Sequence, residues 1–262
     1  MALSFHRHLK KLVIDVFSHP EFTPEKIVKK LQKVARRPCY KEDSERFDAW
    51  IRHKGITGIV HFTPLDNVPF ILKYGLMPRD YLELEVVNLA LGSKFTDNFR
   101  RDGQPEYNCL SFTSPNYRML YSKRNTLKDN RWAVLVFEPA VLRNLFFLFT
   151  PTNSASGCNA AEGVSGAEAS FTLPELRENL GISSYEPTDP QAELLCDSII
   201  DSDSIIGVYV ENHPDLVWLM QQGILSEINN NMFQPRQDFK FWKKTNITDI
   251  QEGWKSPSFL EI

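Results

Sequence analysis

The spacing of apolar residues along the chain changes near Gly55. Before this glycine, apolar side chains recur at intervals of three and four, which is typical of helices that pack through one face. A first helix is predicted from the apolar stripe of Leu9, Leu12, Val13, Val16 and Phe17. A third, short helix is predicted from Phe47, Trp50 and Ile51. Between them, Thr23-Pro24-Glu25 predicts the start of a second helix, because it combines an N-cap residue, a proline and an acid in the first turn.

After Gly55 the apolar pattern switches to short runs, the first of which, Ile56–Phe62, is β-branched. These runs predict strands at 56–62, 107–113, 132–138, 145–150, 192–196 and 205–210. Helices are predicted from Val68 to a stop at Gly75, and near 173–180 and 214–222. Residues 76–106 are expected to be irregular, 151–169 to form a long functional loop, and 230–262 to wrap the surface as a tail. Strands and helices that mix without a regular alternation favour the α+β class.

Length and composition fit one compact domain with an appendage. The chain has 262 residues, of which 42% are hydrophobic and 24% charged. No apolar run approaches the roughly 18 residues that a membrane span needs, and charge interrupts the N-terminal apolar positions, unlike in a secretory signal. Four cysteines (Cys39, Cys109, Cys158 and Cys196) lie far apart without a CxxC pair. We therefore expect a cytoplasmic protein with reduced thiols, no metal site and no membrane association.

The charge is distributed unevenly along the chain. Residues 1–131 carry a balance of +8 and residues 132–262 a balance of −11, within a net charge of −3. A basic half is typical of proteins with a polyanionic partner, although a solvated charged surface explains the pattern equally well. The most plausible phosphate track consists of Lys94, Arg100, Arg101, Arg118, Lys123, Arg124, Lys128 and Arg131.

Several familiar catalytic motifs are absent, including the Walker loop, GxGxxG, HExxH and GxSxG. The remaining candidates for a functional site are short polar segments beside the predicted strands. His61-Phe62-Thr63 ends the first strand of this set, and Arg100-Arg101 precedes the second. Glu193 lies between apolar neighbours, where a carboxylate is costly unless it has partners or a catalytic role. The pattern alone leaves open that Glu193 faces water.

Four short segments, taken in the order of the chain, together resemble the motifs of a known family. They are Ile59-Val60-His61-Phe62-Thr63 through Asp66-Asn67 to Gly75-Leu76; Phe112-Thr113-Ser114-Pro115 to Met119-Leu120-Tyr121; Phe149-Thr150 with Asn153-Ser154-Ala155-Ser156; and Gln191-Ala192-Glu193-Leu194-Leu195 with residues 205–210. Together they resemble the DarT family of DNA-targeting ADP-ribosyltransferase toxins over roughly residues 56–212. Residues 1–52 precede the first segment, Tyr117 and Arg118 interrupt the second, and Cys196 replaces a valine. The chain is thus identified as a divergent member with an N-terminal helical extension.

The resemblance implies an α+β fold of the ADP-ribosyltransferase type, a split β-sandwich with flanking helices and NAD in its central cleft. It divides the chain into a helical extension (1–54), a transferase core (55–225) and a tail packed on the core (226–262). Glu193 is then the catalytic carboxylate, and Arg100 or Arg101 the arginine that supports catalysis. The implied NAD contacts are His61, Thr63, Asn67, Gly75, Tyr121 and Arg101. The implied acceptor contacts are Asn153, Tyr185, Gln191, Arg118, Lys123 and Arg124.

The expected activity is transfer of ADP-ribose from NAD, as co-substrate, to a base in single-stranded DNA. Single strands are favoured because a duplex would require the base to flip out, which costs a few kcal/mol. The resemblance also implies a toxin or phage-defence effector with a cognate antitoxin that includes an ADP-ribose-removing macrodomain. Alternatives are the same chemistry on RNA bases (mRNA or tRNA) or on protein, and a non-catalytic nucleic-acid-binding module. An RNA 2′-phosphotransferase is a weaker alternative, since it needs several basic side chains rather than a glutamate.

Overall fold

The structure is a computed structural model that describes residues 36–82, 104–127, 131–156 and 159–245, with positions 26, 29–31, 33, 247 and 250. Several predictions lie outside the described residues. They are the helix around Leu9–Phe17, most of the second predicted helix, and Lys94, Arg100, Arg101, Lys128 and Cys158.

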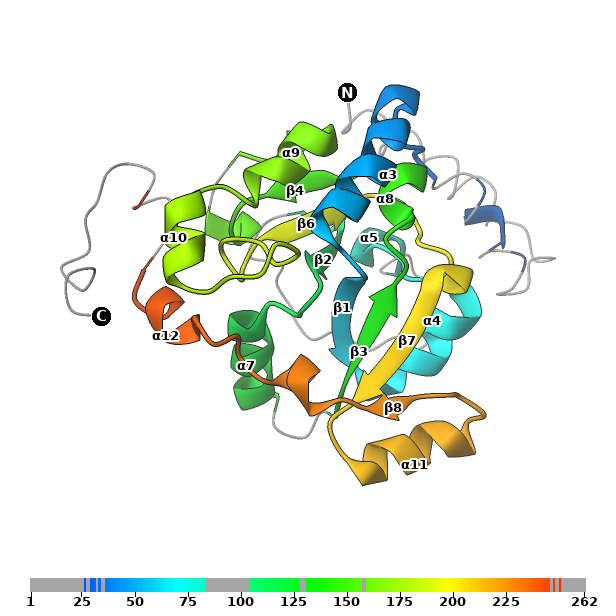
Figure 1. Cartoon of the computed structure of the whole chain (residues 1–262). Helices are drawn as coiled ribbons and strands as arrows, with labels where there is room; N and C mark the ends of the chain where they lie inside the picture. Colours follow the sequence, from blue (N-terminus) through cyan, green and yellow to red (C-terminus); the bar gives the residue numbers. More distant parts are fainter. Residues whose placement is uncertain are drawn as a thin grey trace.

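Eight strands form one mixed sheet in the order β5-β4-β6-β2-β1-β3-β7-β8 (Figure 1). Their bounds are β1 Ile59–Pro64, β2 Asn108–Phe112, β3 Trp132–Phe137, β4 Leu148–Thr150, β5 Ala161–Glu162, β6 Glu193–Cys196, β7 Ile205–Val210 and β8 Glu227–Ile228. Neighbouring strands are antiparallel except for β7 and β8, which are parallel. All six predicted strands are confirmed, with ends that differ by up to a few residues.

The sheet splits at its centre, between β1 and β2. β1 pairs with β3 along its whole length, from Ile59 opposite Phe137 to Pro64 opposite Trp132. With β2 it forms only two residue pairs, Ile59 with Phe112 and Val60 with Ser111. Beyond Val60 the two halves of the sheet therefore lose their shared ladder. Polar side chains at this point can enter the gap without breaking strand hydrogen bonds.

The helices flank the sheet on both faces. Their bounds are α3 Lys41–Lys54, α4 Val68–Tyr74, α5 Arg79–Leu82, α7 Tyr117–Thr126, α8 Val141–Asn144, α9 Gly163–Ala169, α10 Pro174–Asn179, α11 His213–Gln221 and α12 Phe239–Trp242. Short 3₁₀ turns lie at η1 Leu65–Asn67, η2 Ser154–Ser156, η3 Ser202–Ser204 and η4 Asn230–Phe233. The mixture of helices and strands confirms the α+β class. The helices predicted around Trp50, from Val68 to Gly75, and near 173–180 and 214–222 are also confirmed.

The prediction of a long loop at 151–169 is wrong. This stretch contains η2, β5 and α9, which its small and polar residues do not favour by propensity. Packing explains α9: a Cβ on Gly166 would lie 2.6 Å from the carbonyl oxygen of Ala161, so the small residues allow a close approach to β5. Short helices also interrupt the predicted irregular stretch, at α5, and the predicted tail, at α12.

Helix α3 packs into the main hydrophobic core. Phe47 and Trp50 are 2% and 7% exposed. The Trp50 ring lies 5.9 Å from that of Phe112 and 5.4 Å from that of Phe171, centroid to centroid. On the other face of the sheet, a second cluster joins Val60, Leu120, Trp132, Val134, Val136 and Phe233. The division at residue 54 stays a prediction, but α3 is a part of the core that supports β2 and β4.

Candidate active site around Glu193

Glu193 is the first residue of β6, and its carboxylate is buried. Only 3% of the residue is exposed, and it pairs with Thr150 of the neighbouring strand β4. Its Oε1 accepts a hydrogen bond from Nδ2 of Asn153 at 3.1 Å, and its Oε2 accepts one from the backbone N–H of Ser154 at 2.9 Å. The side chain therefore does not face water, and two neutral donors stabilise it in one orientation.

The turn after β4 explains why Asn153 reaches this carboxylate. Thr150 ends the strand and donates from its hydroxyl to the carbonyl of Glu193 at 3.4 Å. The chain then turns tightly: Oδ1 of Asn153 accepts from the N–H of Ala155 at 2.9 Å, and its carbonyl accepts from the hydroxyl of Ser156 at 2.6 Å. Asparagine favours such turns because its amide bonds to the backbone two residues on. The side-chain oxygen of Asn153 thus fixes the turn, while its side-chain nitrogen donates to Glu193.

His61 occupies the split between β1 and β2. Its Nδ1 lies 2.9 Å from the carbonyl oxygen of Cys109, the strand residue on the far side of the gap. A carbonyl oxygen can only accept, so Nδ1 carries the proton in this contact. The His61 ring also stacks on Phe62, with centroids 6.4 Å apart. The histidine therefore bridges the two halves of the sheet.

The other predicted NAD contacts near β1 have different surroundings. Thr63 is 4% exposed, and its hydroxyl accepts a hydrogen bond from Nδ2 of Asn67 at 3.2 Å. Gly75 has a φ of 86°, and a Cβ there would lie 2.6 Å from the carbonyl oxygen of Ile200. The close packing of Leu76 against Ile200 is thus sufficient to require glycine at position 75.

Helix α7 presents the remaining candidates of the basic half. Tyr121 is 55% exposed, and its ring lies 6.0 Å from that of Tyr117. Arg118 is exposed, whereas Arg124 forms an ion pair with Glu211 at 2.6 Å. Lys123 lies in the last turn of the helix. These residues therefore all lie on one helix, and the charge of Arg124 is paired with that of Glu211.

The turn that leads into α7 contains two residues that the sequence analysis did not single out. Thr113 has a φ of 54°, a strained conformation for a β-branched residue and one that is common at functional sites. Asn116 is 2% exposed and caps α7 by accepting from the N–H of Met119 at 3.1 Å. Within the described part of the chain, Nδ2 of Asn116 has no hydrogen-bond partner. Both residues fall inside the second resembling segment, the one signal that pointed to them.

The predicted acceptor contacts before β6 are divided by burial. Tyr185 is 43% exposed, and its carbonyl accepts from the hydroxyl of Thr113 at 3.5 Å, which ties the loop to the turn before α7. Gln191 is only 8% exposed, and its N–H donates to Oδ1 of Asp189 at 2.8 Å. Tyr185 is therefore accessible to a ligand, while Gln191 supports the backbone before Glu193.

The described residues hold no group of three or more His, Cys, Asp or Glu side chains placed to bind a metal ion.

The thiols of two cysteines, Cys39 and Cys196, are protonated at neutral pH. Burial, with a contribution from Asp43, raises the pKa of Cys39 to about 11, and complete burial raises the pKa of Cys196 further. No helix in the described ranges is both long enough and apolar enough to cross a membrane.

Comparison with known proteins identifies the family. The family model described as ssDNA thymidine ADP-ribosyltransferase, DarT, matches residues 60–221, well over half of the 262 residues. The chain belongs to the DarT family. It is therefore an NAD-dependent ADP-ribosyltransferase, with NAD as co-substrate and single-stranded DNA as substrate, on the α+β fold of that family. This confirms the family, fold, cofactor and enzyme class predicted from the sequence.

Solved DarT structures are similar to this chain at low identity. Thermosipho africanus DarTG in complex with ADP-ribose is 19% identical, with a TM-score of 0.45, and the match covers 68% of this chain but only 51% of that one. Thermus sp. 2.9 DarT in complex with NAD+ is 19% identical, covering 68% of this chain and 98% of that one, with a TM-score of 0.47. The same DarT in complex with ADP-ribosylated ssDNA is 17% identical, covering 69% and 97%, with a TM-score of 0.49. No curated protein matches the chain.

Proposed function

We propose that this DarT transfers ADP-ribose from NAD to thymidine in single-stranded DNA, with Glu193 as its catalytic carboxylate. One observation supports this assignment above the others. A carboxylate that is 3% exposed is held by Asn153 and Ser154 at the start of a central strand, inside the family-matched residues.

The reaction breaks the bond between the ribose C1′ and nicotinamide, whose nitrogen leaves with the electron pair. Positive charge then builds on the ribose, as in glycoside cleavage. Glu193 accepts a hydrogen bond from a ribose hydroxyl and stabilises this charge. The base of thymidine has one ring N–H, since its other ring nitrogen is bonded to the sugar; the N–H nitrogen forms the new bond to C1′ while the carboxylate takes the proton as general base.

The proposed NAD site lies along β1 and η1. His61 bridges the split in the sheet, and Thr63 and Asn67 are bonded to each other beside it. These polar groups support a role in holding the nucleotide, with Tyr121 on α7 as a stacking surface for nicotinamide and Gly75 at its margin. Arg100 or Arg101 remains the proposed catalytic arginine; both lie outside the described residues.

The acceptor site is proposed on the loop before β6 and on α7. Exposed Tyr185 offers a ring on which a base can stack, as in other proteins that bind single strands. Arg118 and Lys123 add positive charge for the phosphates. Asn153, which contacts Glu193, is a further proposed acceptor contact, and buried Gln191 contributes by supporting the backbone before Glu193. Arg124 contributes less, since Glu211 already neutralises it.

The proposed biological role is that of a toxin or phage-defence effector acting in the cytoplasm. The DarTG name of the Thermosipho relative supports a cognate antitoxin as a partner. An antitoxin with a macrodomain would remove the ADP-ribose that this enzyme attaches. Residues 1–54 and 226–262 are the proposed extension and tail around the transferase core.

The test compares acceptors under identical conditions. Purified protein is incubated with labelled NAD and, in parallel, with single-stranded DNA, duplex DNA, RNA and protein. We expect label on single-stranded DNA that contains thymidine, and none when thymidine is replaced. Label on RNA alone would favour the RNA alternative, and binding of DNA without transfer would favour a non-catalytic module.

A further inference from the structure

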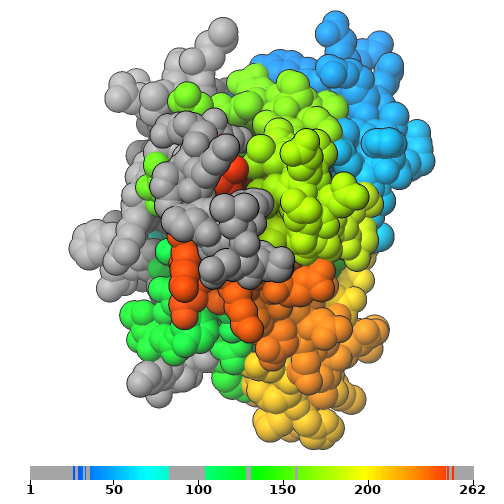
Figure 2. Space-filling view, turned by 60° about the vertical axis from the view of Figure 1, so that its left-hand side comes forward, coloured from blue at the N-terminus to red at the C-terminus, as the bar shows by residue number. Residues whose placement is uncertain are grey.

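The C-terminal segment contacts the loop that leads into the catalytic strand. We call residues 234–242 the clasp and residues 181–192 the acceptor loop. From β8 the chain runs past α7 to α12, which lies beside α10 (Figure 1). In Figure 2 the orange surface of this segment borders the yellow-green surface that includes the acceptor loop. The family match ends at residue 221, so the clasp lies beyond it.

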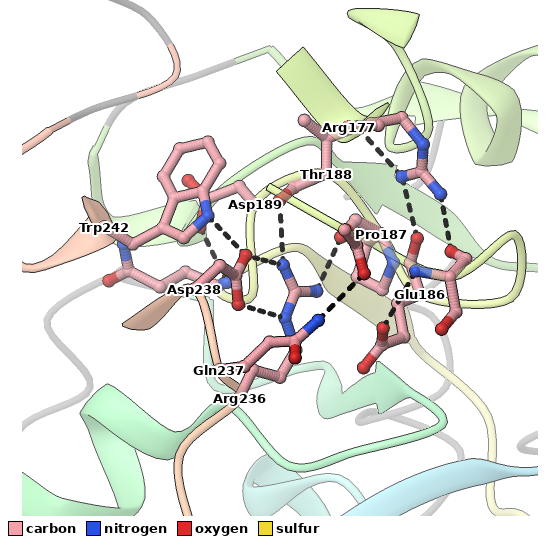
Figure 3. A network of polar contacts seen from close by, with 12 residues as sticks. Arg177, Glu186, Pro187, Thr188, Asp189, Arg236, Gln237, Asp238 and Trp242 are labelled. Atoms are coloured by element: carbon pink, nitrogen blue, oxygen red, sulfur yellow. Dashed lines mark hydrogen bonds and ion pairs between the residues drawn. The ribbon is translucent and has the colours of Figure 1, made fainter. Parts of the chain in front are cut away.

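Arg236 makes the main connection between the two segments. Its Nη1 donates to the carbonyl of Pro187 at 2.6 Å, and its Nη2 donates to the carbonyl of Thr188 at 3.1 Å (Figure 3). The neighbouring Gln237 donates from Nε2 to the carbonyl of Gly181 at 2.9 Å. These bonds satisfy loop carbonyls that have no strand ladder to join.

Asp238 fixes the orientation of Arg236 in turn. Its Oδ1 accepts from Nε of Arg236 at 2.9 Å, and its Oδ2 accepts from Nη2 of the same guanidinium and from Nε1 of Trp242 at 2.8 Å. The side chains of Arg236 and Asp238 are 8% and 1% exposed. Such a buried, two-pronged pair has a defined geometry, which lysine cannot reproduce.

A second guanidinium holds the acceptor loop from its other side. Arg177 of α10 donates to the carbonyls of Ser183 and Glu186 at 2.7 and 2.8 Å, and to the hydroxyl of Thr188 at 3.2 Å. Figure 3 shows Arg177 and Arg236 on opposite sides of the loop, so that Thr188 receives hydrogen bonds from both. Four carbonyls of the acceptor loop therefore accept hydrogen bonds from two arginines.

The fixed backbone continues directly to Glu193. Thr188 and Asp189 are fully buried, and the N–H of Ala192 donates to the carbonyl of Asp189 at 3.0 Å. The Asp189 carboxylate also accepts from the side chain of Thr152, next to Asn153. A shift of the clasp would thus move the loop, and the exposed Tyr185 on it, relative to the catalytic carboxylate. A hollow of about 280 Å³ between loop and clasp, lined by Ser183, Tyr185, Glu186 and Gln237 among others, would change shape with it.

We propose that the clasp positions the acceptor loop for the DNA strand, and that Arg236 is the positioning residue. This inference rests on the proposed function, since it assigns the loop to the acceptor. Arg236 and Gln237 donate hydrogen bonds to the carbonyls of residues 181, 187 and 188. These carbonyls lie outside β1 and η1, which carry the proposed NAD contacts His61, Thr63 and Asn67. Loosening the clasp should therefore weaken use of DNA and leave NAD binding intact.

The test uses Arg236→Lys, which keeps the charge but loses the planar fork. We expect the KM for thymidine-containing single-stranded DNA to rise by about tenfold, because small misplacements of a substrate-positioning group are costly. The KM for NAD should change less than about twofold. Arg143→Lys is the matched control, since Arg143 forms an exposed ion pair with Asp48 at 3.0 Å. Equal effects on both KM values, or none, would overturn the proposal.

A second measurement does not depend on catalysis. Hydrogen exchange of the amides at 181–192 should become faster in Arg236→Lys than in the wild type, with no change in β1. If Arg236→Lys fails to fold, Trp242→Phe removes one donor to Asp238 and keeps the buried ring, and it should show the same pattern more weakly. Unchanged exchange in the folded variant would contradict the clasp. If the wild-type protein does not label DNA, the proposed function is contradicted. The exchange rates would still test whether Arg236 orders the acceptor loop.

Discussion

The side-chain amide of Asn153 donates to the carboxylate of Glu193 across 3.1 Å, joining two segments that are 40 residues apart. The pairing of β4 with β6 brings them together, because Thr150 lies opposite Glu193 in that ladder. A buried carboxylate with oriented donors is ready to interact with a developing positive charge without first reorganising its surroundings. Asn153, first predicted as an acceptor contact, is thus also a direct partner of the proposed catalytic residue.

Replacing Asn153 by alanine should lower kcat more than it changes the KM for DNA. Hydrogen bonds to charged groups contribute about 1.5–3 kcal/mol, which corresponds to a loss of about tenfold to 100-fold in rate. Steady-state kinetics with both substrates measure this. Asn179→Ala, at an exposed position of α10, is the control and should behave like the wild type. A rise in the KM for DNA with unchanged kcat would return Asn153 to a role in acceptor binding alone.

Asp189 should make stability depend on pH. Burial raises its pKa, and hydrogen bonds from Gln191 and Thr152 only partly oppose that effect. The folded state therefore binds this proton more tightly than the unfolded state, and stability is lost as the pH rises through the raised pKa. Asp189→Asn, which is never charged, should raise the melting temperature at neutral pH, and its advantage should shrink as the pH falls toward the ordinary aspartate pKa of about 3.9. Melting curves across this range, with exposed Asp203→Asn as control, provide the measurement; a constant difference would contradict the assignment.

Gly75→Ala should destabilise the fold and leave NAD affinity nearly unchanged. The φ of 86° and the 2.6 Å approach of a Cβ to the carbonyl oxygen of Ile200 both oppose a side chain. We expect the free energy of unfolding to fall by about 2 kcal/mol, as measured by denaturant titration. Weaker NAD binding without a loss of stability would show instead that the glycine contacts the dinucleotide.

Trp50→Ala should destabilise the whole core, although Trp50 precedes the family-matched residues. The ring packs against Phe112 and Phe171, and its Nε1 donates to Glu168 of α9 at 2.5 Å. Deleting a large buried aromatic side chain lowers the free energy of unfolding by about 3 kcal/mol or more. Arg52→Ala on the exposed face of α3 serves as the control. A Trp50 variant with wild-type stability would mean that α3 is a separate extension.

The sequence predicted the strands well because they are short apolar runs with clear boundaries. Glu193 was recognisable for the same reason, as one acid within such a run. Helix α7 was missed: among its residues Tyr117–Thr126 only Leu120 is buried, so it has no apolar stripe. Helix α9 was missed because its glycines lower helix propensity; Gly166 packs closely against Ala161, and Gly163 has a φ of 67° and lies against Asp43.

The clasp was not predictable from local pattern. Arg236 lies 48 and 49 residues from the carbonyls that it contacts, and a charged side chain in a tail normally indicates a solvated surface. The same holds for the partnership of Asn153 with Glu193. Contacts of this kind depend on how distant segments pack together in the folded chain, which the apolar pattern does not encode.

Glu193→Gln provides the most direct test of the central claim, because it keeps the size and one of the two acceptor oxygens while removing the charge and the base. With saturating NAD and thymidine-containing single-stranded DNA, the rate of transfer should fall by about 100-fold or more, with NAD affinity close to that of the wild type. The melting temperature should fall as well, because the amide nitrogen of glutamine cannot accept the hydrogen bond that a carboxylate oxygen accepts from Asn153 or Ser154. Glu227→Gln, at an exposed position in β8, should transfer ADP-ribose at the wild-type rate. A Glu193→Gln enzyme that transfers ADP-ribose as fast as the wild type would contradict the account.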